Sequence, residues 1–196
     1  YIGPTEDPKR WMDFAIVVEG PAVLTLNEVF AADWHFATNE PVEQILTKTS
    51  LVDFEKKGDV TLQTVASGPD VAHDIFYEAL LSAIFLAKKR LWIVTPYFVP
   101  DDTLLRILTI VAHLGRDVRL VIPRKSDHRM IDFARGYGIR QLADAGGKIL
   151  LYQPRMVHTK LLLIDDDVAA MGSANMDMRS LYLNYEIAMF SYNKPV

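Results

Sequence analysis

A short apolar run at residues 161–164 constrains the fold of this chain more than any other feature. All four residues are leucine or isoleucine, so the segment is apolar on both faces. A strand of this kind suits a sheet that is covered by helices, because side chains alternate between the two faces of a strand. Asp166 and Asp167 predict a tight turn, and residues 168–171 predict a return strand. The run therefore predicts an α/β fold that contains a hairpin here.

Polar residues flank this hairpin at one end. His158 and Lys160 stand at the start of the first strand, and Ser173 and Asn175 follow the second. Side chains two residues apart share a face, so the two pairs are expected to converge at one edge of the sheet. Asp165 is separated from His158 and from Lys160 by odd offsets. We therefore expect its side chain to face away from them and to be structural.

The convergent group offers the chemistry of a phosphodiester site. An imidazole supplies a nucleophile or an acid–base group, and an ammonium group attracts phosphate. Hydroxyl and amide groups add hydrogen bonds to a charged transition state. The adjacent acids at 165–167 alternate faces, as in a solvated turn, and no metal ligand set follows from them. The sequence thus predicts half of a phosphodiester active site.

The spacing His-x-Lys-x4-Asp-x6-Gly-Ser-x-Asn, from His158 to Asn175, resembles the signature of the phospholipase D superfamily. Every position matches, including Gly172 in a structural role. The resemblance implies that a carboxylate at the start of the next strand, here Glu186, orients the histidine and stabilises the imidazolium. It also implies a mixed, largely parallel sheet sandwiched by helices, the α/β fold of a phospholipase D-like lobe. The implied catalytic set is His158, Lys160, Ser173, Asn175 and Glu186.

Four further segments narrow the resemblance to bacterial cardiolipin synthases: residues 13–23, 95–101, 126–128 and 176–181. The resemblance implies a phosphatidyltransferase that acts on phosphatidylglycerol and releases glycerol. The transfer would pass through a phosphohistidine, without a metal or another cofactor. Lys160, Asn175 and Ser173 would stabilise charge on the phosphoryl oxygens. His158 would protonate the departing glycerol and then accept the proton of the incoming hydroxyl.

Enzymes of this branch carry two copies of the motif, but this chain has one. No other histidine is followed by a lysine two residues later. Residues 13–16 mirror residues 186–189, so Asp13 is interpreted as the partner of a first-copy histidine outside this chain. We expect residues 1–38 to be the tail of a first lobe, 39–69 a linker and entry strand, and 70–196 a second lobe. Such a fragment is expected to be inactive alone.

Apolar periodicity predicts the remaining elements. Strands are expected at residues 12–18, 60–66, 91–95, 118–122 and 149–152, and helices at 21–37, 74–89, 103–113 and 127–145. Ligands of open α/β sheets bind at the loops that follow the strands, which makes Tyr97, Phe98 and His128 candidate substrate-binding residues. For each of them, the alternative of ordinary packing or a surface position stays open.

Net charge and the length of the apolar stretches limit the functions that the chain can have. A net charge of −4 provides no broad basic surface, so no nucleic-acid partner is expected. The most apolar stretch, residues 79–87, is far shorter than the roughly 18 to 20 residues that span a bilayer. We expect a soluble fragment whose parent protein meets phospholipid at the bacterial cell membrane through parts outside this chain. Two alternatives stay open: a phospholipase or nuclease that is active as a homodimer, and a non-catalytic isolated lobe.

Overall fold

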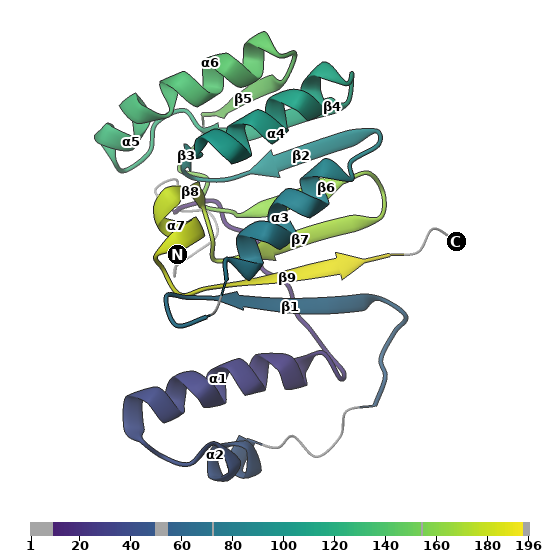
Figure 1. Ribbon diagram of the computed structural model, residues 1–196, viewed down its shortest axis with the longest axis vertical. Helices are drawn as coiled ribbons and strands as arrows, with labels where there is room; N and C mark the ends of the chain where they lie inside the picture. The colour runs from purple at the N-terminus through teal and green to yellow at the C-terminus, as the bar shows by residue number, and fades with distance from the viewer. Residues whose placement is uncertain (1–9, 50–54, 72, 154, 194–196) are drawn as a thin grey trace.

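The computed structural model of the chain describes residues 10–49, 55–71, 73–153 and 155–193 (Figure 1). Its helices are α1 (Val23–Thr38), α2 (Val42–Thr49), α3 (Ile75–Phe85), α4 (Asp102–His113), α5 (Arg129–Ala134), α6 (Gly136–Asp144) and α7 (Met178–Tyr182). Its strands are β1 (Thr61–Ser67), β2 (Arg90–Val94), β3 (Phe98–Val99), β4 (Asp117–Pro123), β5 (Lys148–Tyr152), β6 (Leu161–Ile164), β7 (Val168–Gly172), β8 (Met176–Asp177) and β9 (Glu186–Tyr192).

Seven strands form one mixed sheet in the order β1-β9-β7-β6-β2-β4-β5, and β3 pairs with β8 in a small parallel sheet. In the large sheet, β4 runs parallel to both β2 and β5. The other four neighbouring pairs are antiparallel, including the predicted β6–β7 hairpin. The expected α/β fold with a mixed sheet flanked by helices is confirmed, and within the large sheet the parallel pairs are those among β2, β4 and β5.

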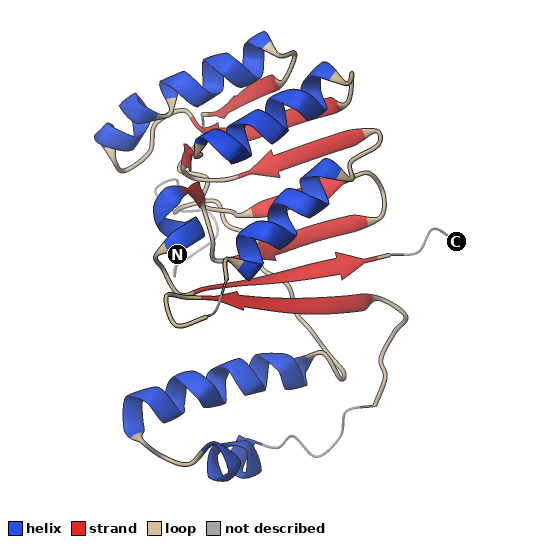
Figure 2. Ribbon diagram, viewed as in Figure 1, coloured by secondary structure: helices blue, strands red, loops and turns tan. Residues whose placement is uncertain are grey.

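Helices α3, α4 and α6 pack on one face of this sheet (Figure 2). The strands turn alternate side chains toward that face, where Leu91, Ile93 and Leu120 are inaccessible to solvent. In β6, Leu162 and Ile164 are buried in the same core, but the alternate residues at 161 and 163 are only half-buried. The run is apolar on both faces, but the face of β6 that carries residues 161 and 163 is less completely covered than the face that carries Leu162 and Ile164.

Three other expectations differ from the structure. The strand expected at residues 12–18 is absent. In this segment β-type pairing is limited to the isolated bridge between Met12 and Val157. The expected linker contains α2. The helix expected at 127–145 is divided between α5 and α6 at Arg135, whose guanidinium group turns inward and donates to the carbonyls of Pro123 and Arg124 at 2.7 and 2.8 Å. Two glycines in the first turn of α6 weaken helix continuity further.

Asp165 connects the β6–β7 turn to the segment between α3 and β2. Its carboxylate accepts backbone hydrogen bonds from Lys88, Lys89 and Arg90 at 2.9, 2.7 and 2.9 Å. Burial raises the pKa of Asp165, but these three hydrogen bonds outweigh it, and the pKa lies below its ordinary value. Asp165 also adopts φ 51°, a left-handed conformation that Asp and Asn tolerate better than most residues. The contacts give this motif residue a structural function.

We expect Asp165→Asn to destabilise the fold by about 1.5–3 kcal/mol, since an amide replaces a charged acceptor of three hydrogen bonds. Asparagine preserves the left-handed backbone, so the substitution isolates the loss of the charge. Urea unfolding of Asp165→Asn and of the exposed control Asp167→Asn measures the effect. Because the pKa of Asp165 is lowered, the difference should be full above its ordinary pKa and shrink as the pH falls below it. Equal unfolding midpoints for the two variants at neutral pH would contradict this structural function.

Candidate active site

The β6–β7 hairpin brings both halves of the motif to one edge of the sheet. Leu161 pairs with Met171, so Lys160 precedes β6 at the end of the hairpin where Gly172 closes β7. The first residues of β9 lie at the same edge, since Gly172 pairs with Ala188. The antiparallel register therefore supports the convergence that the spacing predicted.

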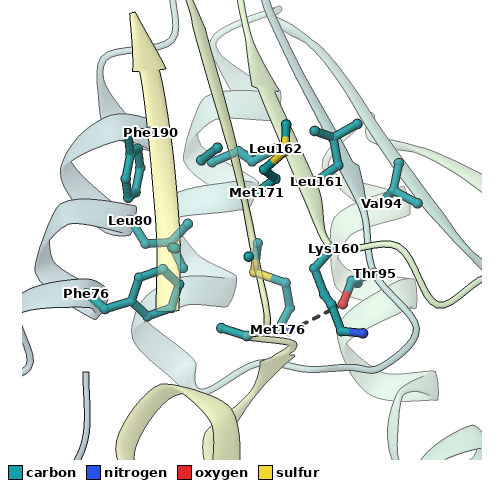
Figure 3. A pocket seen from close by; sticks show the side chains of 14 residues that line it. Phe76, Leu80, Val94, Thr95, Lys160, Leu161, Leu162, Met171, Met176 and Phe190 are labelled. Atoms are coloured by element: carbon teal, nitrogen blue, oxygen red, sulfur yellow. Dashed lines mark hydrogen bonds between the residues drawn. The ribbon is translucent and has the colours of Figure 1, made fainter. Parts of the chain in front are cut away.

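Lys160 is in direct contact with His158. Its Nζ atom lies 2.8 Å from Nδ1 and 3.0 Å from Nε2 of the imidazole, and it donates to the His158 carbonyl at 2.7 Å. The lysine also lines a cavity of about 30 Å³ whose wall is largely apolar, including Phe76 and Phe190 (Figure 3). This cavity has room for about one water molecule. A phosphate group therefore has to approach Lys160 from outside it.

His158 is paired with Asp13. The carboxylate Oδ2 of Asp13 lies 3.3 Å from His158 Nδ1, and two backbone hydrogen bonds of 2.7 Å tie Met12 to the segment before the motif. A parallel bridge between Met12 and Val157 sets this register, which places position 13 beside position 158. The sequence predicted instead that Glu186 orients His158 and that Asp13 is the partner of a first-copy histidine outside this chain. In the described residues the carboxylate that contacts His158 is that of Asp13.

Glu186 instead holds the side chain of Ser173. It accepts hydrogen bonds from Ser173 Oγ and, at 3.1 Å, from Asn184 Nδ2. Ser173 Oγ accepts in turn from the backbone N–H of Ile187 at 3.0 Å. Burial lowers the pKa of Lys160, and the negative charge of Glu186 opposes part of that effect through space. Glu186 thus fixes a hydroxyl group near the lysine.

Burial and neighbouring charges determine the pKa shifts of His158 and Lys160. Burial lowers the pKa of His158, the charge of Lys160 lowers it further, and Asp13 and Asp127 oppose these effects without cancelling them. Burial likewise lowers the pKa of Lys160, against the opposing carboxylates of Asp13 and Glu186. His158 is therefore neutral near pH 7, with a nitrogen lone pair available to accept a proton or attack an electrophile.

Asn175 occupies a half-buried position at the same edge. Its Nδ2 group donates to Ser180 Oγ at 3.2 Å, whereas its Oδ1 atom is buried without a hydrogen-bond partner. A rotation of the amide by half a turn would let the Ser180 hydroxyl donate to Oδ1. The Nδ2 group would then occupy the buried position that Oδ1 holds now, where a ligand oxygen reaches it only if the residues covering that position move apart.

The three residues that were expected to bind substrate do not lie together: Tyr97 and His128 are near Asp127, whereas Phe98 lies in the core. Tyr97 donates to Asp127 at 2.6 Å, its ring lies 5.8 Å from that of His128, and the charge of Asp127 raises the pKa of His158. Tyr97 and His128 thus lie together beside Asp127, and within this cluster the charge of Asp127 is the one that acts on His158. Phe98 is fully buried within β3 and packs in the hydrophobic core. It offers no exposed surface to a substrate.

Within the described ranges, no group of three or more His, Cys, Asp or Glu side chains is arranged to hold a metal ion. No helix in the same part of the chain combines the length and the apolar composition needed to cross a bilayer.

The fold and this edge of the sheet define an α/β domain equipped for acid–base or nucleophilic chemistry at phosphate. The sequence profile of the family described as "Cardiolipin synthase, PLD-like domain" matches residues 80–196. The chain belongs to this family.

Curated proteins named cardiolipin synthase are similar to nearly the whole chain. The chain is 38% identical to the cardiolipin synthase of Alkalihalophilus pseudofirmus over 193 residues, which covers 98% of the chain and 38% of that relative. It is 36% identical to cardiolipin synthase A of Yersinia pseudotuberculosis over 180 residues, 92% of the chain and 37% of the relative. The chain therefore spans well under half the length of these relatives.

Solved structures share the fold. The phospholipase D family member Nuc from Salmonella typhimurium superposes with a TM-score of 0.57 at 22% identity, covering 70% of this chain and 86% of that one. The phosphatidylserine synthase of Haemophilus influenzae superposes with a TM-score of 0.54 at 16% identity, covering 80% and 43% respectively. At these identities the two structures are evidence of the fold.

Sequence reasoning missed the contact between Asp13 and His158. The similarity of residues 13–16 to residues 186–189 did mark Asp13 as a carboxylate of interest. It could not identify which histidine Asp13 meets, because the two residues are 145 positions apart. Asp127 was also missed, since a carboxylate acting through space leaves no spacing pattern.

Proposed function

We propose that this chain is the part of a cardiolipin synthase-like phosphatidyltransferase that carries one of two motifs, and that the complete enzyme transfers a phosphatidyl group between phosphatidylglycerol molecules. The observation that supports the proposal most directly is the contact of His158 with both Lys160 and Asp13 at one edge of a fold that belongs to this family. Membrane contact through parts outside this chain forms part of the same proposal.

The transfer takes place in two steps. A first-motif histidine attacks the phosphorus of one lipid, and the phosphorus–oxygen bond to glycerol breaks as the imidazolium of His158 gives its proton to the departing oxygen. His158, now neutral, accepts the proton of the incoming hydroxyl. The oxygen of that hydroxyl attacks phosphorus and breaks the phosphorus–nitrogen bond. Glycerol leaves in the first step, and cardiolipin forms in the second.

The two steps use different protonation states of His158. The first step uses the imidazolium, which is the minor form near pH 7 because the pKa of His158 is lowered, although the same shift makes it a stronger acid toward the departing oxygen. Once that proton has gone, the neutral imidazole is available as the base for the second step.

Lys160, Ser173 and the amide of Asn175 are the proposed donors to the phosphoryl oxygens, where negative charge increases in the transition state. The hydroxyl proton of Ser173 now goes to Glu186, so this role requires that it turn from the carboxylate to the phosphate. Since Nδ2 of Asn175 now binds Ser180 and the position of Oδ1 is buried, this role requires both the rotated amide and an opening of that position to the ligand.

We expect Asp13→Asn to shift the acid limb of the pH–rate profile to lower pH in the two-motif enzyme. Asp13 raises the pKa of His158, so its neutralisation lowers that pKa further. The step that needs neutral His158 then persists to lower pH. Glu186→Gln, whose carboxylate contacts Ser173 instead, should reduce turnover without moving the limb. The profile of turnover against pH for both variants is the measurement, and a limb displaced by Glu186→Gln alone would contradict the pairing of Asp13 with His158.

The proposal is tested by measuring cardiolipin formation from phosphatidylglycerol vesicles. We expect none from the isolated chain, because one imidazole and one lysine occupy a site whose chemistry uses two of each. A longer protein that also contains a first motif should form cardiolipin and release glycerol. Phosphatidic acid as the sole product would assign water as the acceptor and refute the transferase. Activity of the short chain that rises with the square of its concentration would show that two copies complete one site.

A further inference from the structure

Thr95 is a buried polar residue to which the proposed reaction gives no role. It directly follows β2 and is 1% exposed. Its hydroxyl group donates to the carbonyl of Tyr97 at 2.9 Å and accepts from the backbone N–H of Met176 at 3.3 Å. The hydroxyl therefore joins the turn after β2 to β8 (Figure 3). A buried hydroxyl that is used both as donor and as acceptor fixes the two segments that it joins.

Strand register places Thr95 beside two of the proposed phosphate donors. The last residue of β2 pairs with the first residue of β6 in an antiparallel ladder, so the next pair in this register is Thr95 with Lys160. Opposed side chains lie on the same face, and these two residues line the same small cavity (Figure 3). Thr95 also binds Met176, the residue that follows Asn175. Thr95 therefore lies opposite the lysine and is bonded to the segment that carries the amide.

The backbone on both sides of Asn175 is held by other elements. Before it, the N–H of Ser173 donates to the carbonyl of Ile187 in β9 at 2.9 Å. After it, the N–H of Met176 donates to Thr95. Strand β8 has two residues and belongs to a two-stranded sheet, so the hydrogen bond to Thr95 supports a short ladder. The rotation of the Asn175 amide that donation to phosphate requires thus takes place on a backbone that β9 and Thr95 fix.

We propose that Thr95 is a positioning residue for the reaction: its hydroxyl group holds the amide of Asn175 at a fixed position relative to the ammonium group of Lys160. This inference rests on the proposed function, in which these two groups donate to the oxygens of one phosphoryl group. Both donors have to reach those oxygens at the same time, and a displacement of about 1 Å can reduce a rate by about 10²-fold. Thr95 itself does not touch the substrate, because it is buried and acts through the backbone of Met176.

The test compares Thr95→Val with Thr95→Ser in the two-motif enzyme. Valine has nearly the size of threonine but lacks the hydroxyl group, whereas serine retains it. We expect Thr95→Val to lower kcat for cardiolipin formation by about tenfold or more with KM within about threefold, because the loss falls on the transition state. Thr95→Ser should keep both constants within about threefold of the parent, since it preserves the hydrogen bonds. Val111→Ala, in the core near the end of α4, is the control for stability and should keep kcat within about twofold.

A second substitution shows whether Thr95 acts through Asn175. Asn175→Ala should itself lower kcat by about 10²-fold, as for loss of a donor to transition-state charge. In that background Thr95→Val should lower kcat by less than about threefold further, because residues that act through one another have non-additive effects. Urea unfolding establishes that each variant is folded in the assay. If Thr95→Val does not fold, Thr95→Cys replaces it and should lower kcat by about threefold or more, since a thiol is a weak donor and a weak acceptor.

Each other outcome overturns the inference at a different point. Full turnover of Thr95→Val, or of Thr95→Cys in its place, would show that the hydroxyl positions nothing. Equal losses in that variant and in Thr95→Ser would assign the effect to packing, and a rise in KM alone would assign it to substrate binding. Full additivity with Asn175→Ala would show that Thr95 acts independently of the amide. If Asn175→Ala keeps full turnover, or if the unsubstituted enzyme forms no cardiolipin, the proposed function fails at that step, and the role of Thr95 fails with it.

Discussion

Substitution of His158 by alanine should lower turnover of the two-motif enzyme by about 10²- to 10⁴-fold, the range typical for loss of a general acid–base group. The structure gives the physical reason. The imidazole is the group in contact with both an ammonium group and a carboxylate at the edge of the sheet, and its lowered pKa lets it give and take a proton near neutral pH.

The initial rate of cardiolipin formation measures this effect, with thermal melting of both proteins to establish that the fold persists. His113→Ala is the control, since His113 is exposed at the end of α4 and distant in sequence from the motif. Turnover of His158→Ala within a factor of about three of the parent would refute the assignment of His158 as the proton-transfer group.

The second large effect concerns folding. Gly172→Ala should destabilise the chain by about 3 kcal/mol or more, at or above the upper end of the usual cost of an added methyl group in a packed site. A Cβ atom at Gly172 would lie 2.1 Å from the carbonyl oxygen of Ile187 and 2.7 Å from Cα of Ala188. Both contacts are with the backbone of β9, so relief requires that β7 and β9 separate.

Urea unfolding tests this expectation against Gly58→Ala, where an added Cβ would meet nothing within 4 Å. The control should differ from the parent by less than about 1 kcal/mol. Similar unfolding midpoints for the two glycine variants would show that the close approach of β7 to β9 does not require glycine. A large effect at Gly172 alone would show that this position of the motif requires glycine because β7 and β9 pack closely there.

Much of the fold follows from local patterns. The apolar run at 161–164, the acidic turn and the return strand predicted the β6–β7 hairpin because its three parts are adjacent in sequence and obey a two-residue period. The same period placed Lys160 and Ser173 at one end of the hairpin. It also predicted that Asp165 faces away from the motif, and the carboxylate does bind the backbone before β2.

The sequence determined which residue types supply the chemistry and which of them share the edge of a hairpin, since these depend on spacing within one supersecondary unit. The tertiary structure decided which groups meet across long separations. It paired His158 with Asp13 and Glu186 with Ser173, and it placed Phe98 in the core. Such contacts depend on how distant segments pack, and the carboxylates of Asp13 and Glu186 look equally suitable in a linear pattern. Packing against the segment before the motif brings Asp13 to the imidazole, while strand β9 carries Glu186 to the hydroxyl of Ser173.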